Sequence, residues 1–310
     1  MSAADDPVDP PVPGPIAAES PPRWQRWLSL LFSLALLGVV VWQLAEGGLD
    51  KIPDALPRNA PFYIAIALSY FALPAFDWII FRRLWRLPAS GFLALVKKRV
   101  ANDVLVNYSG EAYFYLYAKR HAQLTDAPFG AIKDVNILSA LAGNLLTMIL
   151  ILAAWPMLGR LALTVSPDLL LGSGAIVVAV SLALILLGKR LFTLPRRWLY
   201  EIFGWHFLRI LSSSALLALA WYFALPDVGL NYWLLFAALR LLIGRLPLVP
   251  STELLFAAAA VVVAPPGGDI APVLAMSAGL YLAANLVLGL VLSGSDVFVR
   301  SRTTDEQFRS

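Results

Sequence analysis

The chain contains no cysteine and only two histidines among its 310 residues. The missing cysteines exclude disulfide bonds, thiolate metal sites and cysteine nucleophiles. Because His121 and His206 lie far apart in the sequence, we expect no histidine-rich metal site and no cofactor. The net charge of +4 is modest, and no nucleic-acid partner is expected.

Charged residues are scarce as well. They make up 14% of the chain, whereas 59% of its residues are hydrophobic and the mean hydropathy is +0.73. An ordinary soluble domain is about 45–50% apolar and about 25% charged. The composition therefore excludes a soluble core and indicates a polytopic membrane protein. Only short segments remain outside the apolar ones, so no sizeable extramembrane domain is expected.

Recognisable catalytic motifs are missing too. The sequence contains no HExxH, GxSxG or Walker motif and no paired aspartate motif of a prenyl-phosphate enzyme. This pattern favours transport or binding over catalysis, and we expect no enzymatic activity. An integral-membrane transferase stays an alternative, which product turnover by the pure protein would support.

Proline is concentrated at the N-terminus, where residues 1–22 hold seven of the 22 prolines and four acidic residues. Proline fixes φ and removes a hydrogen-bond donor, so we expect a disordered cytoplasmic tail. The tail lacks the basic start of a signal peptide. The predicted organisation is this tail, a single transmembrane domain over 23–299 and a cytoplasmic tail over 300–310.

Long apolar segments dominate the rest of the chain. Crossing about 30 Å of hydrocarbon takes about 20 apolar residues. Six segments meet this requirement, namely residues 27–45, 62–81, 136–156, 169–187, 206–225 and 272–292. The predicted fold is therefore all-α, with six clear transmembrane helices and two broken segments described below.

Basic residues follow the second and fourth predicted spans and precede the third. They include Arg82, Arg83, Arg86, Lys97, Lys98, Arg99, Lys119, Arg120, Lys133, Lys189 and Arg190. Cytoplasmic loops carry such an excess, which places both termini in the cytoplasm of a bacterial inner membrane. The run from Arg82 to Arg99 is expected to attract anionic lipid, with a dedicated head-group site as the alternative.

The first broken segment covers residues 100–118, between two basic and therefore cytoplasmic loops. A segment that enters and leaves on one face is not an ordinary span, so we predict a re-entrant element or an interfacial amphipathic hairpin. Non-helical backbone at membrane depth is tolerated where it is buried in protein or lines a wet cavity. The candidate substrate-binding residues here are Asn107, Ser109, Gly110 and Glu111.

The second broken segment covers residues 231–264 and contains two short apolar pieces, 232–243 and 252–264. Pro247 and Pro250 lie between them and disfavour helix in the residues that precede each proline. The charge pattern predicts that this segment enters and returns on the periplasmic side. Its candidate substrate-binding residues are Arg240, Arg245, Ser251, Thr252 and Glu253.

Two broken segments that enter from opposite faces are typical of an inverted repeat with a site near the midplane. Alternatives stay open for individual residues. Glu111 and Glu253 either interact with the dipole of a half-helix or serve the site. Arg240 either extends to a membrane face or joins Arg245 in binding a phosphate.

Three polar residues inside predicted spans have more ordinary expected roles. Asp77 lies near the end of the second span and is expected to form an interfacial ion pair with Arg82 or Arg83. Asn144 and Asn285 are expected to form interhelical hydrogen bonds.

Short motifs in both broken segments resemble the flippase-like transmembrane region of the lysylphosphatidylglycerol synthases. They are Asn107–Tyr108–Ser109–Gly110–Glu111 followed by Lys119–Arg120, and Arg240 followed by the stretch from Pro247 to Glu253. The resemblance extends over most of the chain in the order of its spans. It implies a stand-alone lipid-translocating domain without the synthase activity.

We therefore expect an inner-membrane transporter of an amphiphile whose head group is anionic or zwitterionic. Its partners would be membrane lipids, most simply ones that carry a phosphate. The alternative is a non-transporting membrane protein that recruits or regulates a lipid- or glycan-modifying enzyme. Leaflet-resolved lipid assays would support the first function, and co-purification from native membrane the second.

Overall fold

The computed structural model describes residues 57–104, 109–121, 129–158, 179, 192–244, 252–264 and 269–307. These residues form helices, and no strand occurs among them. Four helices are long and apolar enough to cross a membrane, namely α3 (Ala60–Trp85), α6 (Phe129–Leu158), α9 (Arg196–Ala224) and α12 (Ile270–Gln307). The protein is therefore all-helical where it is described, and its apolar helices indicate a multi-pass membrane protein.

Four of the six predicted spans are thus confirmed as long apolar helices. The predicted span 27–45 and the tail 1–22 lie outside the described residues, as does 169–187 apart from residue 179. Helix α12 continues to Gln307, past residue 292 and into the predicted C-terminal tail.

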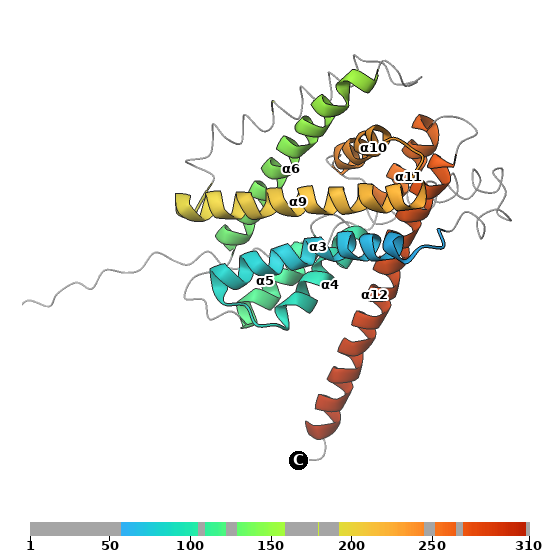
Figure 1. Ribbon diagram of the computed structural model, residues 1–310. Helices are drawn as coiled ribbons and strands as arrows, with labels where there is room; N and C mark the ends of the chain where they lie inside the picture. The colour runs from blue at the N-terminus through green and yellow to red at the C-terminus, as the bar shows by residue number, and fades with distance from the viewer. Residues whose placement is uncertain are drawn as a thin grey trace, which may run out of the picture.

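Helices α3 and α9 lie side by side and antiparallel (Figure 1). Four contacts fix their register: Asn59 Nδ2 to the Phe223 carbonyl at 2.6 Å, Ser69 Oγ to the Ser213 carbonyl at 2.8 Å, Arg209 Nη1 to Asp77 Oδ1 at 3.4 Å, and Arg83 Nε to Glu201 Oε1 at 2.6 Å. Helix α9 begins well before residue 206, where the predicted span began. The helix also includes Trp198 and Leu199, which pack against the core, and Glu201, which forms an ion pair. A prediction that looks only for a long run of apolar residues misses this first part of the helix.

The first broken segment is an antiparallel pair of helices, α4 (Gly91–Val104) and α5 (Ser109–His121). The Gly110 amide donates to Asn102 Oδ1 at 2.7 Å near the break, and Ser90 Oγ lies 3.1 Å from Tyr117 OH near the open end. The pair therefore has the hairpin arrangement that was predicted, although it begins at Gly91 rather than at residue 100, and its re-entry into the membrane stays a prediction. Residues 105–108 lie outside the described part of the chain.

The second broken segment contains α10 (Leu230–Ile243) and α11 (Thr252–Val263). These bounds match the two apolar pieces predicted at 232–243 and 252–264. Residues 245–251 between them, which include both prolines, are not described. The prediction of two short apolar helices is therefore confirmed.

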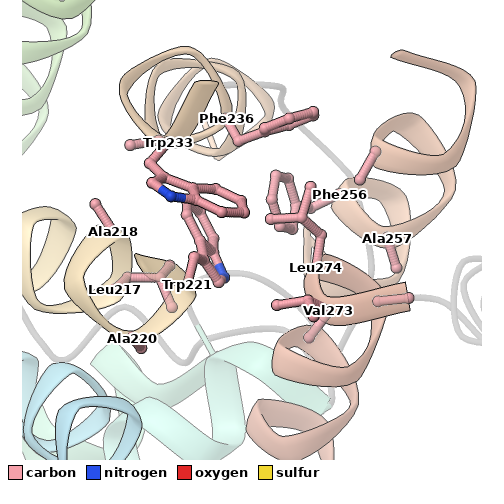
Figure 2. Close-up of a cluster of buried hydrophobic side chains, with 14 of the residues drawn as sticks. Leu217, Ala218, Ala220, Trp221, Trp233, Phe236, Phe256, Ala257, Val273 and Leu274 are labelled. Carbon is pink, nitrogen blue, oxygen red and sulfur yellow. The ribbon is translucent and has the colours of Figure 1, made fainter. Parts of the chain in front are cut away.

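Two apolar clusters stabilise opposite ends of the α3–α9 pair. One contains the aromatic group Trp221, Trp233, Phe236 and Phe256 (Figure 2). The ring centroid of Trp221 lies 5.9 Å from that of Trp233 and 5.9 Å from that of Phe256. The other joins the second half of α3 to α4, α5, α6 and the start of α9, and includes Phe81, Leu95, Phe114 and Ile202. Along both α3 and α9, a stretch with buried polar residues separates the two clusters.

Asn59 gives the first testable expectation, because it caps α3 and also binds α9. Its Oδ1 accepts from the Phe62 amide at 3.0 Å, while its Nδ2 donates to the Phe223 carbonyl. An N-cap contributes about 0.5–2 kcal/mol, and a further hydrogen bond about 1 kcal/mol. Asn59→Ala should therefore lower the free energy of unfolding by about 2 kcal/mol, measured by detergent-denaturation titration.

Asn59→Asp is the matched control, because it keeps the accepting oxygen and removes only the donated bond. Its loss should be clearly smaller than that of Asn59→Ala. Equal losses for the two variants would contradict a capping role for this side chain.

Candidate functional site: a layer of buried charges

Eight aspartate, glutamate, lysine and arginine side chains lie between the two apolar clusters, and we call them the polar layer. They are Asp77 on α3, Lys98, Arg99 and Asp103 on α4, Glu111 on α5, Arg209 on α9, Arg240 on α10 and Glu253 on α11. Four are cationic and four are acidic, so their formal charges cancel. Six helices contribute to the layer, including all four helices of the two broken segments.

Asp77 is the acceptor at one end of the layer. It is 3% exposed, and its Oδ2 accepts a hydrogen bond from Lys98 Nζ at 3.2 Å while its Oδ1 accepts one from Arg209 Nη1 at 3.4 Å. Arg209 Nη2 also donates to Ser139 Oγ on α6 at 2.7 Å, which joins a fourth helix to the group. The predicted interfacial pair of Asp77 with Arg82 or Arg83 is therefore wrong: α4 and α9 bring buried cations close enough to neutralise Asp77.

Lys98 and Arg99 also differ from their predicted role. The sequence pattern assigns both to a basic cytoplasmic loop, but they are only 4% and 7% exposed within α4. Successive residues of an α-helix point about 100° apart, so the two side chains reach different neighbours. Lys98 lies against Asp77, whereas the Arg99 guanidinium lies 3.9 Å over the Tyr70 ring and donates to the Tyr70 carbonyl.

Glu111 joins the layer from the first turn of α5, with Oε1 3.6 Å from Lys98 Nζ. Gly110 makes this position possible, because a Cβ there would lie 2.0 Å from the Lys98 carbonyl oxygen. Only glycine allows α5 to begin so close to α4. The Glu111 carboxylate therefore faces the layer from the first turn, and its Oε2 is buried without a hydrogen-bond partner in the described part of the chain.

Asp103 connects α4 to α12. Its Oδ2 lies 3.5 Å from Arg99 Nε and accepts from Asn285 Nδ2 at 3.1 Å. Asn285 in turn accepts a hydrogen bond from Tyr70 OH on α3. The predicted interhelical hydrogen bonding of Asn285 is therefore confirmed. Asn285 links the Asp103 carboxylate on α4 to Tyr70 on α3.

Arg240 and Glu253 form the other end of the layer. Both oxygens of Glu253 accept from the Arg240 guanidinium, with Nε and Oε2 3.4 Å apart, in a bidentate geometry. The Arg240 guanidinium lies 4.9 Å from the ring centroid of Tyr281, and that of Arg99 lies 5.4 Å from the same centroid. Ser69 Oγ and the Tyr281 hydroxyl are hydrogen-bonded at 2.6 Å, which fixes the ring. One aromatic ring therefore makes cation–π contacts with two arginines.

The structure places the predicted site residues in three groups. Arg240 and Glu253 are in direct contact, while Gly110 and Glu111 belong to the Lys98 end of the layer. Ser109 begins α5 and Thr252 begins α11. Asn107, Arg245 and Ser251 lie outside the described residues.

The two predicted groups are joined through α4 rather than directly. Within the described ranges, no hydrogen bond or ion pair connects Glu111 to Arg240 or Glu253. Lys98 and Arg99 are neighbours on α4, and Asp103 lies within electrostatic range of the Arg240–Glu253 pair. A single polar layer therefore connects both broken segments.

Exposure differs along the layer, and one end is more open than the other. The side chains of Asp77 and Lys98 are 4% and 6% exposed, whereas those of Arg240 and Asp103 are 24% and 32% exposed. The Asp77 end is therefore enclosed by protein. At the Arg240 end the guanidinium and the Asp103 carboxylate are partly exposed, while the Glu253 side chain is only 10% exposed.

Sequence reasoning overlooked Arg209, although a signal was present. Arg209 is the only charged residue in the predicted span 206–225, and an ionisable residue in a span points to a functional role by default. The same rule selected Arg240. Tyr70 and Tyr281 gave no signal of this kind, because tyrosine is common in membrane helices and only the packing brings these two rings under the arginines.

Among the described residues, no group of three histidine or carboxylate side chains is placed to hold a metal ion. The layer instead offers paired guanidinium, ammonium and carboxylate groups, a set suited to a charged organic ligand. Comparison with protein-family models, curated proteins and solved structures finds no match for this chain.

Proposed function

We propose that this protein binds lipids with an anionic or zwitterionic head group and lets the head group cross the membrane through the polar layer. In this proposal it is a stand-alone flippase-like domain, similar to the transmembrane region of the lysylphosphatidylglycerol synthases. One observation carries the proposal. Balanced charged groups from six helices lie between apolar clusters, and five of the eight (Asp77, Lys98, Arg99, Arg209 and Glu253) are buried, where an unpaired charge would cost several kcal/mol.

Arg240 is the group that would bind the head group. A guanidinium binds a phosphate and a carboxylate in the same bidentate way, so Glu253 occupies the geometry that a lipid phosphate would take. When a phosphate replaces Glu253 on Arg240, the freed carboxylate can pair with an amine of a zwitterionic head group. For a zwitterionic head group, the completed exchange therefore keeps the layer neutral.

The acyl chains would not need a polar path. Large apolar side chains such as Leu68, Leu152 and Val287 are more than half exposed, as expected of surfaces that face lipid tails. A lipid could therefore keep its chains in the bilayer while its head group contacts Arg240 and Asp103. Only the head group would need the protein, because its transfer into hydrocarbon carries the large free-energy cost.

Proteoliposomes with a fluorescent phospholipid and a membrane-impermeant quencher test this proposal. The wild-type protein should expose inner-leaflet lipid to the quencher faster than empty vesicles do. Arg240→Gln with Glu253→Gln keeps the net charge and removes the bidentate site. Losing contacts worth about 1.5–3 kcal/mol should slow lipid movement about tenfold or more.

Arg83→Gln with Glu201→Gln is the matched control, because it neutralises another arginine–glutamate ion pair, which lies outside the layer. This variant should move lipid at the wild-type rate. If the wild-type protein moves no tested phospholipid or aminoacylated phospholipid faster than empty vesicles, the transport proposal is wrong. Co-purification of a lipid- or glycan-modifying enzyme would then favour the non-transporting alternative.

A further inference from the structure

A hollow lies at the corner between α3 and α4, away from the polar layer. It measures about 450 Å³ and is lined by Arg82, Arg86, Leu87, Pro88 and Ala89. Pockets that bind small ligands are usually about 300–1,000 Å³ in volume. The hollow therefore has room for a phosphate-bearing head group, and it brings two arginines to one place.

Trp78 contacts residues on both sides of this hollow. The Arg82 guanidinium lies 4.8 Å from the centroid of the Trp78 ring, and Trp78 Nε1 donates to the Pro88 carbonyl at 3.1 Å. One indole thus positions a cation and the turn that faces it. Less side-chain freedom is lost when a ligand binds to a guanidinium that is already held in place.

The chain reversal at Arg86 places the second arginine. Arg86 has a left-handed backbone with φ of 54°, and its amide donates to the Arg82 carbonyl at 2.8 Å. A positive φ is unfavourable for any residue other than glycine, asparagine or aspartate. The left-handed turn ends α3 and leaves Arg82 and Arg86 lining the same hollow.

The two arginines carry charge that no carboxylate among the described residues neutralises. Both are exposed, and neither forms an ion pair within the described part of the chain. Arg83 between them points elsewhere and pairs with Glu201. Two such guanidinium groups beside the exposed apolar residues Pro88 and Ala89 suit a phosphate whose remaining substituent is apolar, since guanidinium binds phosphate oxygens in bidentate fashion.

We infer that the Arg82–Arg86 hollow is a second binding site, specific for a phosphate group and separate from the polar layer. The site binds its ligand without moving it, and it does not depend on the transport proposal. The phosphate comes either from an anionic lipid head group or from a soluble phosphate. Lipid is the source that the exposed apolar residues Pro88 and Ala89 of the lining favour.

Native mass spectrometry of the full chain in neutral detergent tests this inference. Phosphatidylglycerol and a phosphate-free diacylglycerol are added separately, and inorganic phosphate is then used as competitor. The wild-type protein should bind phosphatidylglycerol in preference to diacylglycerol. In an Arg240→Gln/Glu253→Gln background, which lacks the head-group site of the polar layer, Arg82→Gln with Arg86→Gln should weaken that binding about tenfold or more, because two charge-assisted contacts are lost.

Arg196→Gln with Arg197→Gln is the matched control, since it removes two exposed arginines at the start of α9. In the same background, it should leave phosphatidylglycerol binding unchanged. If millimolar inorganic phosphate displaces the lipid, the site recognises the phosphate group alone. If it does not displace the lipid, the rest of the lipid molecule contributes to binding. Equal binding with and without Arg82→Gln/Arg86→Gln in that background, or an equal loss in the control, would overturn the inference.

The outcome is independent of lipid movement. Within that background, Arg82→Gln with Arg86→Gln changes no further residue of the polar layer, so a lost adduct in that variant reports on the hollow alone. A failed transport assay would leave this result unaffected. Circular dichroism of the same samples confirms that both double variants remain folded.

Discussion

Asp77→Asn is expected to lower the free energy of unfolding by about 3–5 kcal/mol, because it leaves a buried charge without its partner. Asp77 accepts from Lys98 and Arg209, and all three residues are less than a tenth exposed. Asparagine has nearly the same shape as aspartate but carries no charge. Lys98 would then rely on Glu111 at 3.6 Å, and Arg209 would keep only Ser139.

Detergent-denaturation titration measures this loss, and a double variant identifies its cause. Asp77→Asn with Arg209→Gln removes one charge of each sign and leaves the Lys98–Glu111 pair. It should be more stable than Asp77→Asn alone if the cost arises from the unpaired Arg209. A double variant that is destabilised by the sum of the two single changes would contradict this explanation.

Glu201→Gln is the peripheral comparison for Asp77→Asn. Its partner Arg83 is 54% exposed, and an exposed ion pair contributes about 0–1 kcal/mol. Glu201→Gln should therefore change stability by less than Asp77→Asn does. Similar losses for the two variants would mean that burial in the layer does not determine the cost.

Gly110→Ala is expected to cost about 2–3 kcal/mol, since a well-packed position accommodates added atoms poorly. The added Cβ would lie 2.0 Å from the Lys98 carbonyl oxygen and 2.8 Å from Asn102 Oδ1. A backbone oxygen within a helix has little freedom to retreat. Helix α5 would therefore move away from α4, and Glu111 would move away from Lys98.

Gly204→Ala provides the opposite expectation within the same protein. Gly204 lies inside α9, and a Cβ there would meet no atom within 4 Å. Alanine in a helix interior is more favourable than glycine by about 0.5–1 kcal/mol, so Gly204→Ala should be neutral or stabilising. If Gly110→Ala were as well tolerated as Gly204→Ala, the close contact between α4 and α5 would not exist.

Apolar length and helix-breaking residues were sufficient to predict much of the fold. Spans 62–81 and 136–156 correspond to α3 and α6, because a run of about 20 apolar residues has few alternatives in a membrane. The interruption between 243 and 252 followed from Pro247 and Pro250. The hairpin of α4 and α5 followed from basic residues on both of its flanks.

The polar layer was only partly predictable, because pairing between helices is a property of the packed structure. A count of basic residues treats Lys98 and Arg99 as loop charges, although the contacts of α4 with α3 bury both. Asp77 lies near two arginines in sequence, but α4 and α9 supply nearer cations. Sequence distance and spatial distance disagree wherever three helices meet.

Arg240 and Glu253 were predictable as a pair of candidates but not as an ion pair. Each is a charged residue beside an interruption in an apolar segment, which marks a site in a membrane protein. Their bidentate contact depends on how α10 and α11 meet, and residues 245–251 carry no pattern that specifies this. Both side chains are therefore found from sequence, and their geometry only from the structure.

The central claim is that a lipid head group binds at Arg240, and a single introduced thiol tests it most directly. The chain has no cysteine, so Thr252→Cys places one thiol at the start of α11 beside Glu253. Its reaction with an uncharged maleimide is measured in nanodiscs of phosphatidylglycerol and in nanodiscs of a phosphate-free glycolipid. Asp227→Cys, which is exposed between α9 and α10, is the control.

A head group bound at Arg240 should slow the labelling of Thr252→Cys several-fold in phosphatidylglycerol relative to the glycolipid. Arg240→Gln should remove that difference, and Asp227→Cys should react equally in both lipids. Equal labelling of Thr252→Cys in the two lipids, or a difference that persists in Arg240→Gln, would contradict the claim that the polar layer binds lipid head groups.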